Sequence, residues 1–331
     1  MNKITVVSPA NIAFIKYWGM KDKDLVLPNN DSYSMNLSHC VTEIVMERYE
    51  NPEIKEVFIQ EYTSNDYKKD NGQATEKVCV FYNRVKNFLG IKDDYGFRIY
   101  SKNSFPKKAG IASSASFFSG LALTFVTGFE KKLDTKQLSI VARLSGSGSA
   151  SRSIPDGFVH WHKGTDSNSS FSESCAPPEH WELCDVVLIV SQTEKKVGSQ
   201  EGHEGAWSSP LYAERLSGIE ERVESVRKAI ETKDVVQLGT TIEADTISMH
   251  AVMMTQKHPL FYWSHKTLSL LKKICVLRRE GLPCYYTIDA GENVHVIVEK
   301  KQVKELVSYF ARQGEVLDII LNSPCVGARQ I

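Results

Sequence analysis

The segment from Asn103 to Phe118 contains residue types that suit phosphate binding. It reads Asn-Ser-Phe-Pro-Lys-Lys-Ala-Gly-Ile-Ala-Ser-Ser-Ala-Ser-Phe-Phe. Small residues let backbone N–H groups approach an anion closely, and a helix that begins near Ser114 would direct the positive end of its dipole at the same place. The segment lacks the Gly-Lys-Ser/Thr ending of a P-loop and the Gly-x-Gly-x-x-Gly spacing of a dinucleotide site. Taken alone, such a turn is more often ordinary helix capping.

Three charged residues lie among small or apolar neighbours elsewhere. Lys16 is flanked by Ile15 and Tyr17, so its stem lies along apolar surface or its ammonium group is held beside an anion. Arg152 ends the run Ser-Gly-Ser-Gly-Ser-Ala-Ser-Arg, which is either a flexible linker or a receptor for phosphate or carboxylate. Asp289 ends an expected strand and precedes Ala-Gly, where it either caps a turn or faces a substrate.

The histidines provide little support for a metal site. His160 and His162 would share one face of a strand and could bind a metal, but no third ligand is spaced to complete the set. We therefore interpret them as surface positions. His250 lies in an amphipathic pattern and is expected to be a hydrogen-bonded core histidine.

The composition is that of a folded globular protein of about two domains. The chain has 331 residues, of which 42% are hydrophobic and 24% charged, so disorder and fibrous repeats are excluded. Lys plus Arg equals Asp plus Glu at 40 each, which gives a formal net charge of zero. We therefore expect neither nucleic acid nor a membrane surface as a partner, and any anion binding must be local.

Cysteine usage and hydropathy predict a cytoplasmic location. The seven cysteines are scattered singly without a Cys-x-x-Cys pair, which argues for reduced thiols and against a disulfide framework or zinc site. Asn11 and Lys16 interrupt the N-terminal apolar stretch before a signal-peptide core could form. No segment is long and apolar enough to span a membrane.

The elements that must position these residues can be read from the hydrophobic periodicity. In the first half we expect strands at 4–8, 37–49 and 95–102, a hairpin within 50–70, a helix over 76–89 that stops at Gly90, a buried helix after the small-residue segment, and a helix capped by Asp134. In the second half we expect strands at 185–191, 284–288, 293–299 and 316–321, a helix at 302–312, and helix starts at Ser209-Pro210 and near Asp234 and Phe261. The latter order is β-α-β-β-α-β, the ferredoxin-like arrangement.

Together these segments resemble the mevalonate diphosphate decarboxylase family of the GHMP kinase superfamily, in the family's order and over essentially the full chain. The family signatures are matched at 11–19, 27–34, 105–115, 146–153, 249–251 and 286–293. The resemblance implies an α+β, GHMP kinase-like two-domain fold. A ribosomal-protein-S5-like domain would cover residues 1–183, and a ferredoxin-like domain with extra helices residues 184–331.

The resemblance also implies ATP-dependent decarboxylation of mevalonate 5-diphosphate to isopentenyl diphosphate in isoprenoid synthesis, with Mg²⁺ and a homodimer. Asp289 would deprotonate or orient the 3-hydroxyl group, Lys16 would steady Asp289 and the phosphate charge, and Arg152 would hold the substrate carboxylate. Further substrate contacts are implied for Tyr17, Lys21, Ser147 and Ser149. Nucleotide contacts are implied for Ser101, Asn103, Ala109, Gly110, Ala112, Ser113, Ser114 and Ser199, with Ser113 also as a ligand of Mg²⁺.

The sequence departs from the family pattern at the end of the site that binds the distal substrate phosphate. Met20 stands where the family has a second Lys, Lys21 stands at an Arg position, and Gln200 stands where many relatives have Arg. Loss of two cations should weaken a diphosphate more than a monophosphate. Compensation could come from Lys21, Lys107, Lys108, Lys195 or Lys196. The alternatives are therefore a decarboxylase of mevalonate 5-phosphate and a non-catalytic ligand sensor on the same fold; a 3-kinase without decarboxylation fits less well.

Overall fold

The larger of two sheets contains strands from both ends of the chain, in a computed structural model that describes residues 3–106, 110–191 and 199–331. Its strands are β1 (Lys3–Ala13), β4 (Ser32–Tyr49), β5 (Lys55–Gln60), β6 (Tyr67–Lys69), β7 (Gly96–Asn103), β8 (Phe158–Trp161), β9 (Ser172–Ala176) and β14 (Arg329–Gln330). Their order is β14-β1-β4-β7-β5-β6, with β8 beside β4 and β9 beside β8. All pairs are antiparallel except β5–β7.

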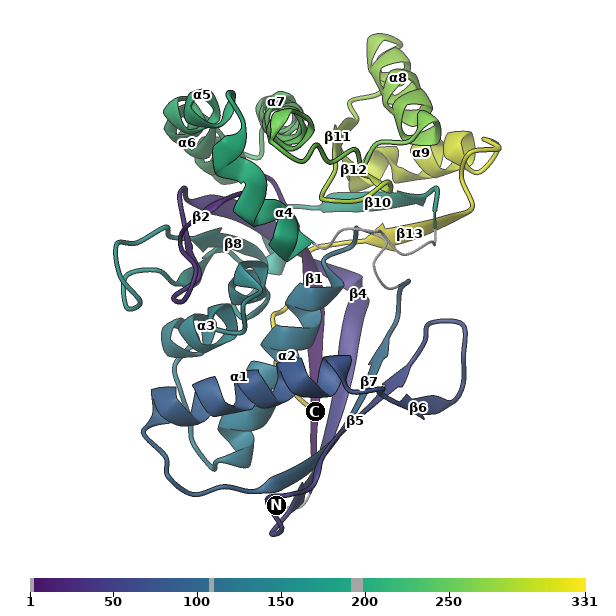
Figure 1. Cartoon of the computed structure of the whole chain (residues 1–331). Helices are drawn as coiled ribbons and strands as arrows, with labels where there is room; N and C mark the ends of the chain where they lie inside the picture. The colour runs from purple at the N-terminus through teal and green to yellow at the C-terminus, as the bar shows by residue number, and fades with distance from the viewer. Residues whose placement is uncertain (1–2, 107–109, 192–198) are drawn as a thin grey trace.

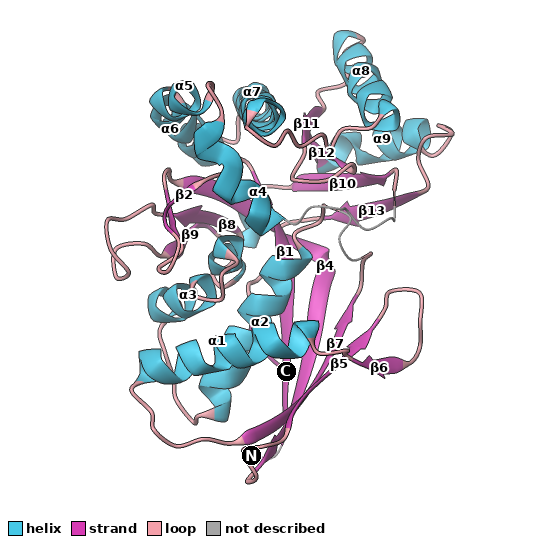
Figure 2. Ribbon diagram, in the orientation of Figure 1, coloured by secondary structure: helices cyan, strands magenta, loops and turns pink. Residues whose placement is uncertain are grey.

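Three helices pack against this sheet: α1 (Gln73–Leu89), α2 (Ser113–Gly128) and α3 (Thr135–Arg143) (Figures 1 and 2). Their apolar side chains pack with those of the strands, and Phe81, Phe97 and Phe125 are at most 1% exposed. The predicted stop of α1 is confirmed, because Gly90 adopts a left-handed φ of 66°. The predicted cap of α3 is also confirmed, since Asp134 and Gln137 form a capping box.

The smaller sheet has the predicted ferredoxin-like arrangement. Its strands are β10 (Leu183–Ile189), β11 (Tyr285–Thr287), β12 (Val294–Glu299) and β13 (Asp318–Asn322), in the order β11-β12-β10-β13. Counted from β10, this is the antiparallel order 2-3-1-4. Helices α8 (His265–Arg279) and α9 (Val303–Phe310) pack on one face through a cluster that includes Leu270 and Phe310 (Figure 1).

The opposite face of the smaller sheet joins the two halves of the chain. One buried cluster contains Ile12 and Met35 of the larger sheet together with Val187 and Ile297 of the smaller one. Helices α6 (Ile219–Thr232) and α7 (Val235–Thr255) contribute to the same cluster. The functional residues at the ends of β1 and β11 are therefore fixed relative to each other by a shared core.

The remaining elements are short. They are β2 (Met20–Asp22), β3 (Leu27–Pro28), α4 (Ser199–Gly205), α5 (Tyr212–Ser217) and the 3-10 turns η1 (Gly148–Ser153), η2 (Pro178–His180), η3 (Ala206–Ser208) and η4 (Lys300–Gln302). Across the described ranges, no helix has the length and apolar character needed to cross a membrane.

Two predicted helix starts are wrong by a few residues. Helix α5 begins at Tyr212 rather than at Pro210, because Ser209 accepts a hydrogen bond from the Leu211 N–H in a turn that precedes the helix. Helix α8 begins at His265 rather than near Phe261, because Ser264 forms a capping box with Thr267. Asp234 caps α7 as predicted.

Candidate active site

Lys16 and Asp289 come from different halves of the chain and form an ion pair. Lys16 lies in the segment after β1, and Asp289 follows β11; Nζ of Lys16 donates to Oδ1 of Asp289 at 2.6 Å. Lys16 is 1% exposed, whereas the side chain of Asp289 is 23% exposed. The ammonium group is therefore sealed in protein, while the carboxylate keeps an accessible side that a substrate can reach.

The pair has shifted protonation equilibria. Burial lowers the pKa of Lys16, although the attraction of Asp289 opposes that shift. Burial alone would raise the pKa of Asp289, but the charge and hydrogen bond of Lys16 outweigh burial and lower that pKa below its ordinary value. Asp289 is consequently a carboxylate at neutral pH and a weaker base than a free aspartate.

Arg152 lies in η1, and neutral partners hold its guanidinium group. Nε donates to Oδ1 of Asn11 at 3.0 Å, and Nη1 donates to Oγ of Ser32 at 2.8 Å. Arg152 is 3% exposed, and burial lowers its pKa to about 10. Amide and hydroxyl oxygens fix the orientation of the group without cancelling its charge. Arg152 thus remains a cation at neutral pH and can attract a carboxylate.

The small-residue segment leads into a helix N-terminus, as predicted, and approaches the turn that contains Asp289. Gly110 has a φ of 78°, and a Cβ atom there would lie 3.1 Å from Cα of Gly291. Ala112 is left-handed with a φ of 38° and gives α2 no side-chain cap. This backbone brings the start of α2 close to the Asp289 turn and makes it suited to an anion.

Hydroxyl groups connect this helix start with the run that carries Arg152. Oγ of Ser147 donates to Oγ of Ser114 at 3.2 Å, and the hydroxyl oxygens of Ser147 and Ser149 are 3.3 Å apart. Nδ2 of Asn11 donates to the carbonyl oxygen of Ser149 at 3.1 Å. Residues predicted for nucleotide and for substrate binding are therefore adjacent here.

The other predicted substrate contacts flank this group. The ring of Tyr17 packs against Trp161 and His203, with centroids 4.9 and 4.2 Å apart, and burial raises the pKa of its hydroxyl group. Lys21 lies on β2, and its ammonium group donates to the carbonyl oxygen of Gly164. Binding roles for both residues remain predictions.

Some predicted nucleotide contacts are strand residues, and others fall outside the described part. Ser101 and Asn103 belong to β7; Ser101 is 3% exposed, and Oδ1 of Asn103 accepts a hydrogen bond from Thr42 at 2.8 Å. Ala109 lies outside the described residues, as do Lys107, Lys108, Lys195 and Lys196. Ser199 begins α4.

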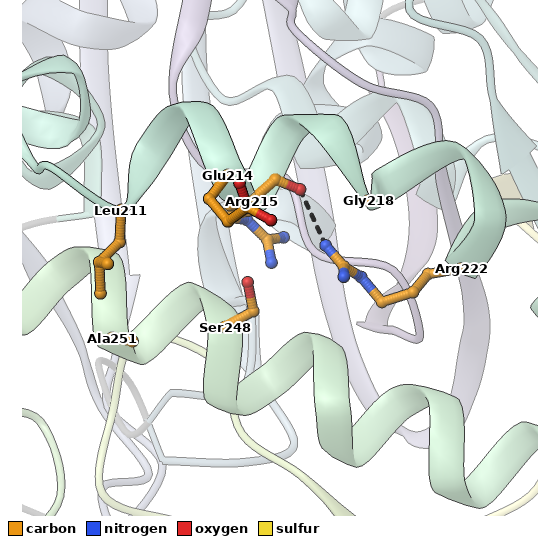
Figure 3. A pocket seen from close by; sticks show the side chains of 7 residues that line it. All are labelled: Leu211, Glu214, Arg215, Gly218, Arg222, Ser248 and Ala251. Atoms are coloured by element: carbon orange, nitrogen blue, oxygen red, sulfur yellow. Dashed lines mark hydrogen bonds between the residues drawn. The ribbon is translucent and has the colours of Figure 1, made fainter.

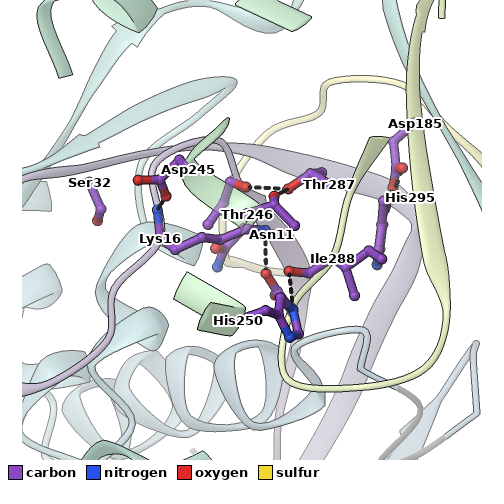
Figure 4. Close-up of polar contacts among 12 residues, drawn as sticks. Asn11, Lys16, Ser32, Asp185, Asp245, Thr246, His250, Thr287, Ile288 and His295 are labelled. Carbon is purple, nitrogen blue, oxygen red and sulfur yellow. Dashed lines mark hydrogen bonds and ion pairs between the residues drawn. The ribbon is translucent and has the colours of Figure 1, made fainter. Parts of the chain in front are cut away.

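Asp245 was missed by the sequence reasoning, although it contacts Lys16. Its Oδ2 accepts a hydrogen bond from the backbone N–H of Lys16 at 2.7 Å, and Figure 4 shows the two residues side by side. Arg215 binds Oδ1 of Asp245 at 3.0 Å and donates to the carbonyl oxygen of Lys16 at 3.2 Å. The peptide groups of Lys16 are therefore held on both sides. The available signal was an aspartate within the apolar pattern of α7.

Arg222 supports this network from α6. Its Nε donates to Oδ1 of Asp245 at 3.1 Å, and its Nη2 donates to the carbonyl oxygen of Arg215 at 2.9 Å (Figure 3). The two arginines line a pocket whose seven lining residues are Leu211, Glu214, Arg215, Gly218, Arg222, Ser248 and Ala251.

The histidine predictions have different outcomes. His250 is a core residue as predicted: it is 1% exposed, its Nε2 lies 3.4 Å from the carbonyl oxygen of Ile288 (Figure 4), and burial lowers its pKa to about 3. The inference that His160 and His162 lack a third ligand is wrong, because folding places Asp31 beside them. Asp31 is far away in the sequence and comes close only through the pairing of β4 with β8.

The start of α2, which suits an anion, lies close to the turn that carries the Asp289 carboxylate. This arrangement and the two-domain architecture place the chain among the GHMP kinase-like enzymes. Two family models match: the diphosphomevalonate decarboxylase-like N-terminal domain over residues 8–172 and the mevalonate 5-diphosphate decarboxylase C-terminal domain over residues 185–319. The chain belongs to the diphosphomevalonate decarboxylase family.

Named relatives and solved structures agree with this placement. Diphosphomevalonate decarboxylase of Candida albicans is 31% identical over 93% of this chain and 87% of its own length. The crystal structure of mevalonate diphosphate decarboxylase from Staphylococcus aureus matches with a TM-score of 0.91 and 32% identity, over 100% of this chain and 98% of that one. A structure of MDDEF in complex with MVAPP, AMPPCP and magnesium matches with a TM-score of 0.88 and 32% identity, over 100% and 99% of the two chains.

Proposed function

We propose that the protein converts mevalonate 5-diphosphate and ATP into isopentenyl diphosphate, CO₂, ADP and phosphate. The observation that carries this proposal is the accessible carboxylate of Asp289, held by buried Lys16 near the start of α2. This arrangement joins a group that can orient a hydroxyl with a backbone suited to nucleotide phosphates. The family membership of the chain supports the same reaction.

Asp289 orients the 3-hydroxyl group of the substrate. A carboxylate with a lowered pKa is too weak a base to ionise a tertiary alcohol in advance. It therefore accepts a hydrogen bond from the hydroxyl and takes up the proton as the bond from oxygen to phosphorus forms. Lys16 stabilises the carboxylate before this step and lies close enough to lower the cost of negative charge on the transferred group.

Arg152 holds the carboxylate of the substrate. Its fixed guanidinium group, oriented by Asn11 and Ser32, provides a stationary cation whose geometry suits a planar anion. Loss of the 3-phosphate leaves an electron-deficient carbon, and the C–C bond to the carboxylate supplies the electrons of the new double bond as CO₂ departs. Arg152 keeps that C–C bond aligned until the leaving group is in place.

The start of α2 binds the nucleotide phosphates through backbone N–H groups, with Gly110 and Ala112 allowing the close approach. The hydroxyl groups of Ser113 and Ser114 are the donor set available for Mg²⁺, an ion that prefers oxygen ligands. When bound, Mg-ATP supplies the phosphoryl group that turns the 3-hydroxyl into a leaving group. We assign Ser101, Asn103, Ala109 and Ser199 to the same nucleotide.

Tyr17, Lys21, Ser147 and Ser149 bind the 5-phosphates. Met20 stands at a position where the family has a lysine, so fewer positive charges would face the distal phosphate. This substitution favours one alternative function, in which the enzyme prefers mevalonate 5-phosphate as its substrate. We further propose that the protein is a cytosolic homodimer and that the two domains of each chain divide at residues 183 and 184, with the last strand, β14, returning to the sheet of the first domain. The cytosolic location is supported by the seven cysteines, all of which are free.

The test is an assay with ATP, Mg²⁺ and each substrate in turn, with CO₂ and isopentenyl phosphate or diphosphate measured together. Both products should form with the diphosphate, and the ratio of kcat/KM values ranks the two substrates. Products from the monophosphate alone would establish the alternative. Nucleotide binding without CO₂ from either substrate would contradict an enzyme and leave a ligand sensor.

A further inference from the structure

Asp31, His160 and His162 form a cluster outside the active site with the composition of a metal site. One ligand atom of each residue lies within 4.8 Å of the other two. The imidazole rings are 3.9 Å apart between centroids, and Nε2 of His160 lies 2.8 Å from Oδ2 of Asp31. Two imidazoles and one carboxylate leave room for water or a fourth ligand in a tetrahedral shell.

The fold determines where each of the three side chains lies. His160 and His162 are alternate residues along β8 and its continuation, so both lie on the same face. Asp31 precedes β4, which pairs with β8 in a register that sets Tyr33 opposite His160. The cluster is therefore built on a paired strand edge, which is a rigid support.

Neighbouring groups orient the ligands before any ion binds. The ring of Tyr33 stacks on His160 at 4.4 Å with an interplanar angle of 8°. The backbone N–H of Lys163 donates to Oδ1 of Asp31 at 2.9 Å, which leaves Oδ2 directed at His160. Such contacts around the ligands are what tune real metal sites.

The cluster is also accessible and has the charge that a cation requires. The side chains of His160, Asp31 and His162 are 15%, 24% and 30% exposed, so an ion can enter. Glu173, 56% exposed, has Oε1 2.7 Å from Nε2 of His162 and adds a second carboxylate beside the three ligands. The nearby ammonium group of Lys163 is paired with Glu220 at 2.9 Å, which offsets its repulsion.

We propose that Asp31, His160 and His162 bind a divalent transition-metal cation of the Zn²⁺ class. Imidazole nitrogen favours Zn²⁺ and its first-row neighbours over Mg²⁺, which prefers oxygen, so this site is chemically distinct from that of the nucleotide metal. Zn–N bonds of about 2.0–2.1 Å require the ligand atoms, which lie within 4.8 Å of one another, to move closer together when the ion binds.

The site adjoins the residues that hold the catalytic cations. Asn30 donates to the carbonyl oxygen of Lys16 at 3.2 Å, and Ser32 accepts from Arg152 at 2.8 Å. Asp31 lies between these two residues in the sequence. A metal bound through Asp31 therefore restrains the segment that supports Lys16 and Arg152, and its role is structural.

The test is titration of metal-free full-length protein with Co²⁺, followed by visible absorption, and with Zn²⁺, followed by calorimetry and by the shift in Tm. One equivalent should bind with the spectrum of nitrogen and oxygen ligands. H162Q and D31N should each weaken binding on the order of 10–100-fold or more, since even partners outside the ligand shell contribute that much. H39Q, which removes an exposed histidine away from the cluster, should bind as the wild type does.

Several results would overturn the site. Unchanged affinity and Tm shift in both H162Q and D31N would do so, as would a cobalt spectrum with thiolate charge transfer, which would assign the ion to cysteines. His162 is partly exposed, so H162Q should retain its fold, and circular dichroism of each variant separates a lost ligand from a lost structure. Because the readout is metal binding, the result is independent of the decarboxylase activity.

Discussion

Two carboxylates contact Lys16, one at its side chain and one at its backbone, and their surroundings differ. Asp289 pairs with the ammonium group and keeps 23% of its side chain exposed. Asp245 binds the backbone N–H, has two arginine partners and is 0% exposed. The carboxylate of Asp289 is therefore open to a substrate, whereas the carboxylate of Asp245 contacts only protein groups within the described residues. Asp289 is suited to chemistry and Asp245 to positioning Lys16.

The largest expected effect is the loss of catalysis when Asp289 is replaced. D289N should lower kcat by about 10²–10⁴-fold with nucleotide binding retained, because the amide cannot take up the proton of the substrate hydroxyl. Steady-state kinetics and nucleotide titration measure both quantities. D93N, at an exposed aspartate, is the matched control and should leave kcat unchanged. Full activity in D289N would place the chemistry elsewhere.

The opposite pattern is expected at Asp245. D245N should lower the free energy of unfolding by about 3–5 kcal/mol, because Arg215 is left as a buried cation without a counter-charge. Denaturant unfolding gives this value. D234N is the control in the same helix, since Asn also caps a helix N-terminus. Unchanged stability with a large loss of kcat in D245N would remove the distinction between the two carboxylates.

Arg152 and Arg215 extend the comparison to cations. Arg215 binds a carboxylate, whereas the guanidinium group of Arg152 binds neutral oxygens and has charge left for a substrate. R152K should lower kcat/KM by roughly 10- to 200-fold, because a point charge replaces a planar fork that contributes about 1.5–3 kcal/mol through charged hydrogen bonds. R279K, at an exposed arginine, is the kinetic control. Wild-type kcat/KM in R152K would show that shape at this position is unimportant.

The smallest expected effect is a shift in pH dependence. The lowered pKa of Lys16 means that its ammonium group loses its proton below the ordinary lysine value of about 10.4, so kcat/KM should fall on the alkaline side earlier than an exposed lysine would allow. K16R keeps its charge and should move that limb to higher pH, whatever its residual activity. Profiles between about pH 7 and 11 test this. Identical alkaline limbs would assign the titration to another group.

Acid pH should act in the other direction through Asp289. Its folded-state pKa is lowered, so its contribution to stability is present above the unfolded value of about 3.9 and is lost as the pH falls through the folded pKa. The pair therefore stays intact throughout the mildly acidic range.

Short sequence patterns predicted much of the fold, whereas contacts between residues far apart in the sequence were not predicted. The cap at Asp134, the stop at Gly90 and the loop before α2 depend on neighbouring residues, so the sequence reports them directly. The bond between Lys16 and Asp245 joins residues 229 positions apart. No spacing rule covers such a distance, because the contact depends on how α7 packs against the end of β1.

The candidate site shows the same division. Lys16, Arg152 and Asp289 could be selected because each is a charge among small or apolar residues, and the ion pair of Lys16 with Asp289 agrees with that selection. Asn11 and Ser32, which orient Arg152, are polar residues within strands and carry no comparable signal. Asp31 completes the histidine cluster from 129 positions away and is revealed only by the register of β4 and β8.

The pairing of β14 with β1 protects part of a strand edge in the larger sheet. Val6 and Val7 pair with Gln330 and Arg329, so residues more than 300 positions apart cover this part of β1. Whenever β14 is unpaired, that part of β1 is an open edge of the kind that recruits foreign strands. A folding intermediate that has formed the rest of the larger sheet without β14 is therefore exposed to aggregation at this edge.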